Sequence, residues 1–160
     1  MSNQGIFYLR TVADLFAKLK CDFERLQRSH ANAYVAFDFF VTAEHLLDWQ
    51  YPGDANKQRR TDERRSEVLL QICSHIATGG KHFQVESPHH QSVKGSELRG
   101  GGFSPLGFQN NAFQVGRLFV NLDGSAAAIY GPSIEVTALA SKILDLWNTR
   151  LAGNTSGGKP

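Results

Sequence analysis

The longest apolar pattern of the chain lies in the stretch AYVAFDFFVTAEHLLDWQ, residues 33 to 50, which predicts an α-helix. At roughly 100° per residue its less apolar side chains fall within one narrow arc, while valine, phenylalanine and leucine occupy the other sides. That arc contains Tyr34, Asp38, Val41, His45 and Asp48. A helix that is apolar on so much of its circumference is typically central and buried. We therefore expect its ionisable groups to be inaccessible and to pair with one another, to pair with another element, or to line a polar cavity.

Further amphipathic patterns predict three more helices around this central one. A first helix spans residues 12 to 28 behind Thr11 as N-cap, and its face with Lys18, Asp22 and Arg25 is expected to be solvated. The short link of residues 29 to 32 favours antiparallel packing of the first two helices. A third helix starts near Thr61 and ends around residues 79 and 80, and a last helix follows Ser133 as cap.

The remaining segments predict a loop and a hairpin. Residues 84 to 112 contain glycines, prolines and no sustained period, which predicts a long exposed loop; its part from 86 to 112 is expected to be mobile and to cover one end of the bundle. Strands over 113–122 and 126–130 are expected to be joined by a turn at Asp123-Gly124, with a short third strand at 83–85.

These elements predict a mostly α fold, a four-helix bundle with a small antiparallel β-hairpin inserted before the last helix. Residues 1–152 are expected to form one domain and residues 153–160 a disordered tail.

Composition narrows the class of protein. A chain of 160 residues with 41% hydrophobic residues can build one ordinary core, and a formal charge of +2 is too small to indicate nucleic-acid binding from bulk electrostatics. With only Cys21 and Cys73, no disulfide framework is expected, which favours a cytoplasmic location. No apolar run is long enough to predict a membrane span.

A second polar stripe follows the third helix, where Arg64, Gln71, His75, Thr78 and His82 share a face. One hypothesis is a polar pocket shared with the central helix. It would be lined by Asp38, His45, Asp48, His75, Lys81 and His82. The alternative is structural, with two buried histidines satisfied by carboxylates.

Cofactor and metal motifs are absent from the sequence. The Gly79-Gly80-Lys81 step lacks the first glycine and the hydroxyl residue of a phosphate loop, and Arg99 with the three following glycines does not follow a strand. The pair His45 and Asp48 is compatible with a metal, but no specific ligand motif accompanies it. We expect neither cofactor nor metal. Arg64 and Lys81 are phosphate-contact candidates, although the arginines near Arg64 also suit a solvated helix start.

The stretches AYVAFDFFVTAEHLLDW and LLQICSHIATGGKHF resemble small bacterial HEPN-like proteins, over about residues 12 to 83. These are helical bundles of defence and toxin systems. The active members carry an arginine a short distance before a histidine, a pair that implies metal-independent RNA cleavage. Here His82 matches the motif histidine, while His75 stands near the place of the arginine. Histidine transfers protons near neutral pH but lacks the permanent forked charge of arginine.

The resemblance implies a HEPN-like domain that binds a nucleotide, RNA or a protein partner in a bacterial defence or regulatory system, without catalysis. A metal-independent ribonuclease or unusual hydrolase using His75 and His82 is the first alternative, and cleavage would then require His82. A helical interaction protein with a purely structural polar stripe is the second alternative. The sequence leaves a homodimer open.

Overall fold

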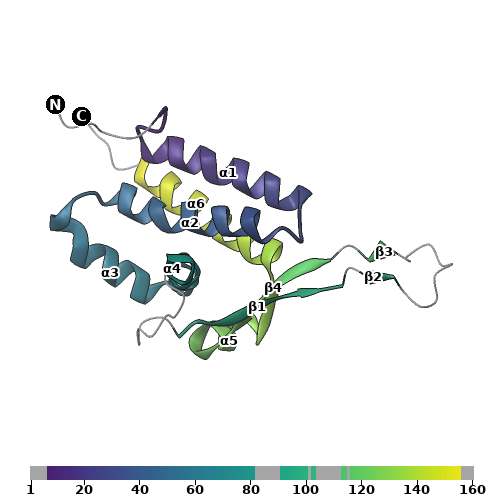
Figure 1. Ribbon diagram of the computed structural model, residues 1–160. Coiled ribbons are helices and arrows are strands. Elements are labelled where there is room, and N and C mark those ends of the chain that lie inside the picture. Colours follow the sequence, from purple (N-terminus) through teal and green to yellow (C-terminus); the bar gives the residue numbers. More distant parts are fainter. Residues whose placement is uncertain (1–6, 82–90, 101, 104–112, 115, 156–160) are drawn as a thin grey trace.

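The computed structural model describes residues 7–81, 91–100, 102–103, 113–114 and 116–155, whose arrangement is shown in Figure 1. These parts form six α-helices and five strands, so the chain is mostly α, as predicted. The helices are α1 (Val12–Arg28), α2 (Ala33–Gln50), α3 (Lys57–Ser66), α4 (Val68–Lys81), α5 (Gly124–Tyr130) and α6 (Val136–Thr155). The described part thus contains two more helices than the predicted four, together with a sheet larger than a hairpin.

The helices α1 and α2 begin and end where the sequence predicts, because local caps define their ends. The Thr11 hydroxyl accepts a hydrogen bond from the Asp14 N–H at 3.2 Å, and the Asp14 carboxylate accepts one from the Thr11 N–H at 2.9 Å. The Asn32 side chain accepts hydrogen bonds from the first N–H groups of α2. The two helices pack side by side in opposite directions, which confirms the predicted antiparallel pair (Figure 1).

The predicted third helix is wrong in one respect, because two helices occupy its place. The backbone is extended at Glu67, where α3 ends, and the Glu67 side chain accepts a hydrogen bond from the Leu69 N–H at 3.2 Å in the first turn of α4. No residue of α3 is buried, whereas α4 buries Leu69, Leu70 and Ile72. The break therefore lets α4 turn into the core while α3 stays at the surface.

The predicted long loop of residues 84–112 is wrong where the structure describes it. Strand β1 (Val93–Arg99) pairs antiparallel with β4 (Arg117–Leu122), and β4 pairs antiparallel with β5 (Ser133–Glu135) in the order β1-β4-β5. A second ladder of β2 (Gly102–Phe103) and β3 (Phe113–Gln114) continues away from the helices (Figure 1). The proposed strand at 83–85 and the parts of the expected mobile loop at 86–90, 101 and 104–112 lie outside the described residues.

The predicted hairpin turn at Asp123-Gly124 is also wrong. The Asp123 carboxylate instead accepts a hydrogen bond from the Gly124 N–H at 2.8 Å and caps α5. Gly124 has a φ of +52°, which favours glycine. The three alanines that follow have high helix propensity, and Ala126 is fully buried in the core. An Asp-Gly pair is compatible with both a hairpin turn and a helix start, and here the alanines that come after it favour the helix.

The last helix, α6, starts after the short strand β5 rather than directly after Ser133, and the Glu135 carboxylate accepts a hydrogen bond from the Ala138 N–H at 3.0 Å. It runs to Thr155, so residues 153–155 are helical rather than part of a tail; residues 156–160 lie outside the described residues. Trp147 of α6 lies in one apolar core shared with α1, α2, α4 and the sheet. In the described part of the chain no helix has the length and apolarity needed to cross a bilayer.

Candidate functional site

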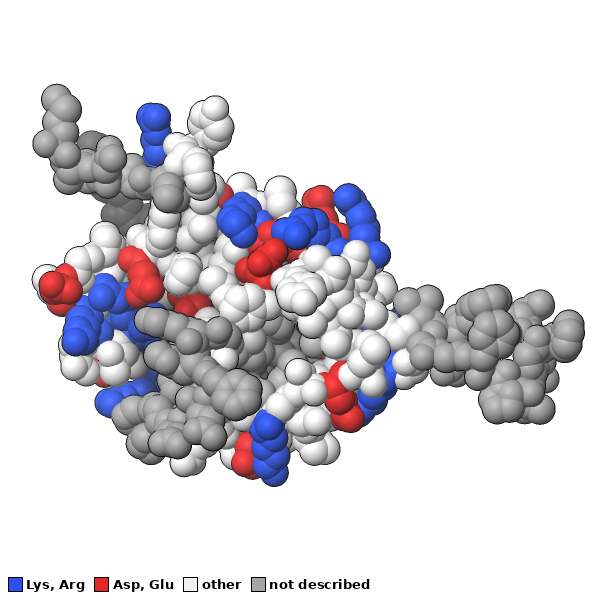
Figure 2. All heavy atoms as spheres, in the orientation of Figure 1, with Lys and Arg blue, Asp and Glu red and all other residues white. Residues whose placement is uncertain are grey.

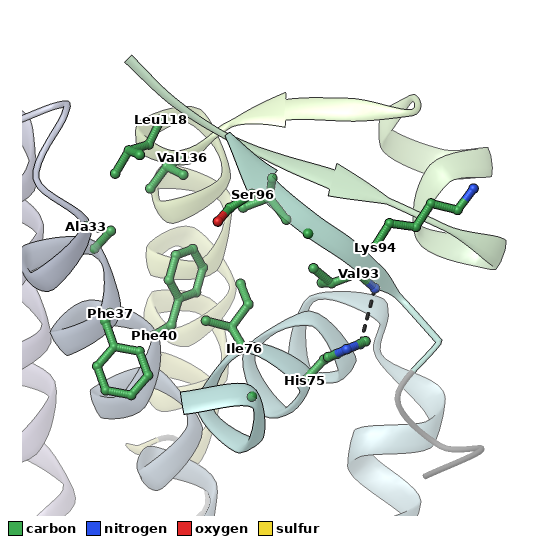
Figure 3. Close-up of a pocket in the computed structure, with 14 residues that line it drawn as sticks. Ala33, Phe37, Phe40, His75, Ile76, Val93, Lys94, Ser96, Leu118 and Val136 are labelled. Carbon is green, nitrogen blue, oxygen red and sulfur yellow. Dashed lines mark hydrogen bonds between the residues drawn. The ribbon is translucent and has the colours of Figure 1, made fainter. Parts of the chain in front are cut away.

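A groove lies between the helices and the free edge of the sheet (Figure 3). Its volume is about 670 Å³. The N-terminal half of α2, the C-terminal half of α4 and strands β1 and β4 supply most of its wall. Its apolar residues include Ala36, Phe37, Phe40, Ile76, Val93, Leu118, Val120 and Val136. A groove with this lining and size is suitable for an apolar ligand or for the side chains of a partner protein.

His75 closes one end of this groove and ties α4 to β1. Its Nδ1 accepts a hydrogen bond from the Val93 N–H at 3.2 Å, and the Ser92 hydroxyl lies 3.4 Å from the same nitrogen (Figure 3). Because a backbone N–H can only donate, this Nδ1 carries no proton while the bond exists. His75 thus holds the strand in place, and its Nδ1 is already engaged.

The cationic group of Lys94, a residue of the groove wall, does not face the cavity. Lys94 lines the groove with its stem but extends away from the cavity (Figure 3). Its Nζ lies 3.4 Å from a carboxylate oxygen of Asp123. The Ser96 side chain, in contrast, points toward the helices. The polar groups available to a ligand in the described wall are therefore neutral, which favours an apolar ligand over a phosphate.

Charges of both signs lie side by side on the face shown in Figure 2. The ion pairs of the described part include Lys18 with Asp22 within α1 and Arg150 with Glu63 between α6 and α3. A mixed surface of this kind does not attract a polyanion strongly. The charges on this face agree in this respect with the small net charge of the chain.

A second cluster of ionisable groups joins α2 to α3. Arg64 Nε lies 2.6 Å from Glu44 Oε1, and Arg64 Nη2 lies 3.3 Å from Asp48 Oδ1. Arg60 Nε lies 3.1 Å from the same Asp48 oxygen. The structure therefore brings together two predicted site residues, Asp48 and Arg64, but as an ion-pair network between helices.

Glu44 has the most perturbed environment in this cluster. Its side chain is only 12% exposed, and its Oε2 is buried without a hydrogen-bond partner among the described residues. Burial raises the pKa of Glu44 to about 7, the Arg64 guanidinium opposes this shift, and Asp48 adds to it. The Ser74 hydroxyl also lowers the pKa slightly, without reaching hydrogen-bond geometry with Oε2. Glu44 thus takes up a proton near neutral pH.

Sequence reasoning missed Glu44, although one signal was present. Glu44 lies between the apolar residues Ala43 and Leu46 on α2, outside the predicted polar arc. An acidic residue on the apolar side of a helix requires a partner. The basic start of α3 could have been recognised as the source of that partner.

The predicted burial of the α2 stripe is wrong. The Asp38 side chain is 48% exposed, and its partner is Arg25 of α1 at 3.4 Å rather than His45 or Asp48. His45 is exposed, and Asp48 is half-exposed. The reason is that α1 and α4 pack against other sides of α2, so the polar arc stays open to water.

The buried carboxylate between α1 and α2 is Asp22, which was expected to be solvated. It is 3% exposed and accepts hydrogen bonds from Lys18 at 2.5 Å and from the Thr42 hydroxyl at 2.8 Å. Arg25 donates to its other oxygen at 3.2 Å. Because Asp22 is satisfied by close partners, this network links the two helices structurally.

The predicted pocket of six polar residues is not assembled by the described ones. His75 lies at the groove and Asp48 in the network with α3, while Asp38 and His45 lie on the open face of α2. Lys81 is the last residue of α4, and neither its side chain nor His82 belongs to the described part. Among the described residues no group of three or more His, Cys, Asp or Glu side chains is placed to hold a metal ion.

Comparison with known protein families, with curated proteins and with solved structures finds no match to this chain.

Proposed function

We propose that this chain is a non-catalytic binding domain and that its groove takes an apolar segment of a protein partner. The observation that carries the proposal is the groove of about 670 Å³, whose apolar wall remains open beside Phe37. Phe37 is 38% exposed at the rim although it is a large apolar side chain. Partly exposed aromatic residues beside an apolar hollow are typical of protein interaction sites.

The chemistry of the groove supports binding rather than catalysis. The Nδ1 of His75 accepts a hydrogen bond from β1, so Nε2 carries the ring proton and does not act as a base while that bond exists. Lys94 pairs with Asp123, and no described base lies within hydrogen-bond distance of the Ser96 hydroxyl. A hydrolase would need an activated nucleophile or water beside a free acid or base. The described wall therefore supports affinity for an apolar segment.

A variant pair tests this proposal. Phe37→Asp places a charge at the rim of the groove, whereas Ile129→Asp changes a more exposed apolar residue of α5 outside it. Peptides that bind the wild-type protein would be selected from a displayed library and titrated by nuclear magnetic resonance. We expect amide shifts at Ala36, Ile76 and Val120, and binding at least about tenfold weaker for Phe37→Asp only. Equal loss in both variants, or shifts away from the groove, would show that the groove is not the site.

A nucleotide or single-stranded RNA is a second candidate ligand, implied by the HEPN-like resemblance and favoured by one observation. A separate hollow of about 620 Å³ is lined by residues 28 to 34, where Arg28 lies near Tyr34. Tyr34 is 85% exposed, so its ring is accessible for stacking with a base. Arg28 pairs weakly with Glu24 at 3.6 Å.

Binding of a fluorescent oligouridine tests this candidate. We expect a Tyr34→Ala variant to bind the probe about tenfold more weakly if a base stacks on the ring, and Tyr8→Ala to serve as the control because Tyr8 is equally exposed. Incubating the same RNA with and without EDTA tests the ribonuclease alternative. Cleavage that resists EDTA and disappears in His82→Ala would support the metal-independent ribonuclease and contradict the binding proposal.

A further inference from the structure

The groove is bordered by an edge of β1 that no other described strand pairs with. In an antiparallel ladder, successive residues point their N–H and C=O groups alternately toward and away from the neighbouring strand. Leu122 donates its N–H to Pro132 on the β5 side, so Val93, opposite Leu122, points away from β4. The Val93 N–H accordingly reaches His75.

The same alternation places the following residues of β1. After the irregularity at Lys94, Ser96 lies opposite Val120 and Leu98 opposite Leu118. The Leu118 N–H points to His30, away from β1, which places the backbone groups of its partner Leu98 on the free edge. No described residue hydrogen-bonds the outward N–H groups of Ser96 and Leu98. His75 therefore closes the edge at Val93, and the edge is open from Ser96 onward.

The groove lies under the face of β1 that the helices cover, next to the open edge. Ser96 and Leu98 share the face of Val120 and Leu118, which is the face covered by the helices. Leu98 is 56% exposed on this face. A further strand beside β1 would thus direct alternate side chains into the groove near Phe37, and the other side chains to the outer face of the sheet.

The outer face of the sheet carries charges of both signs, because Glu97 of β1 and Glu135 of β5 both stand opposite Phe119 of β4. Arg99 stands directly opposite Arg117, and Glu97 is the acidic residue bound to Arg99, at 2.9 Å from its Nε. Arg99 also stacks on Phe119 at 4.3 Å from the ring centroid, which holds its guanidinium at the sheet surface. Its Nη2 also donates a hydrogen bond to the Ser133 hydroxyl of β5 at 2.9 Å, so the guanidinium extends across β4, away from the free edge, and leaves the outer side of an added strand to polar residues of either charge.

We infer that the groove binds its partner by strand addition: an extended segment of a protein partner pairs antiparallel with the β1 edge at Ser96 and Leu98. The segment reads, in its own direction, polar, apolar, polar, apolar, so that its apolar residues stand opposite Leu98 and Ser96 and enter the groove side. This inference rests on the proposed function and names the chemistry of the partner. Backbone hydrogen bonds supply affinity, and the groove selects the side chains.

The probe is a capped peptide, Ser-Asp-Val-Thr-Val-Thr-Ser, titrated into the full-length protein. Leu98→Pro removes one outward N–H without removing a bond to β4, because proline is tolerated at the free edge of a strand. Leu98→Ala keeps the N–H and removes the side chain, so it is the matched control. We expect about tenfold weaker binding for Leu98→Pro than for Leu98→Ala, and slower hydrogen exchange at Ser96 and Leu98 with the peptide bound.

Modified peptides test the same bonds from the other side. Methylation of the backbone nitrogens of both valines should abolish binding, and methylation at the threonines should leave it in place. Binding lost in Phe37→Asp but equal for both Leu98 variants would overturn strand addition and leave the groove proposal standing. Absence of peptide binding up to the solubility limit would also overturn strand addition, as would a dimer of the free protein that Leu98→Pro dissociates, because the occupant of the edge would then be a second copy.

Discussion

Glu44 makes the stability of this protein depend on pH, and Glu44→Gln tests that dependence. Burial raises the pKa of Glu44 from 4.5 to about 7 in the folded chain. Between these two pH values the folded protein holds a proton that the unfolded chain has released. The free energy of unfolding therefore falls as the pH rises through this window. The stabilising contribution is complete below pH 4.5 and is lost above pH 7.

The magnitude follows from the same two values. At about 1.4 kcal/mol for each pKa unit, the difference between 4.5 and about 7 corresponds to about 3 kcal/mol. Glutamine has the shape of the protonated glutamic acid side chain and does not titrate. The free energy of unfolding of the variant therefore does not fall with rising pH at this site. We expect the free energy of unfolding of Glu44→Gln minus that of the wild type to increase by about 3 kcal/mol between about pH 4 and about pH 8.

Urea unfolding followed by circular dichroism at a series of pH values measures this difference. Glu24→Gln is the control, because it removes an exposed carboxylate that also pairs with an arginine. Arg64→Leu removes the guanidinium that opposes the shift, so the loss with pH should become larger. A difference between Glu44→Gln and wild type that stays constant over the whole pH range would refute the reasoning.

Two further predictions concern the contacts that hold the elements together. Asp22→Ala should lower the free energy of unfolding by about 2 kcal/mol, because Lys18, Arg25 and the Thr42 hydroxyl lose the buried carboxylate to which all three donate. Asp38→Ala removes an exposed carboxylate and should change the free energy of unfolding by less than about 0.5 kcal/mol in the same urea titration. His75→Phe should leave the Val93 N–H without an acceptor, so the exchange of that amide should become about tenfold faster; unchanged exchange would show that His75 does not hold β1.

The sequence by itself determined the features that depend on neighbouring residues. Thr11 and Asp14 form the start of α1, and Asn32 forms the start of α2, because each cap connects groups within one helical turn. The predicted bounds of these two helices are correct for that reason. The mostly α class follows likewise, since amphipathic periodicity is a local property of the chain.

Only the tertiary structure decided which polar groups are buried. Asp22 and Asp38 both lie on amphipathic helices, yet Asp22 faces α2 and Asp38 faces solvent. Glu44 acquires its environment from α3 and α4 together. Burial depends on which element covers a helix face, and that element is distant in the sequence.

The candidate site depends on the same distant contacts. The strand VKGSELR has low β propensity and exposed side chains, so its sequence does not predict a strand, and pairing with β4 holds it in place. The groove exists because this strand lies beside α2 and α4, and His75 fixes the point where the open edge begins. A local pattern in the sequence specifies the helices. Contacts between segments that are distant in the sequence specify the edge of β1, the groove beside it and the partners of the buried charges.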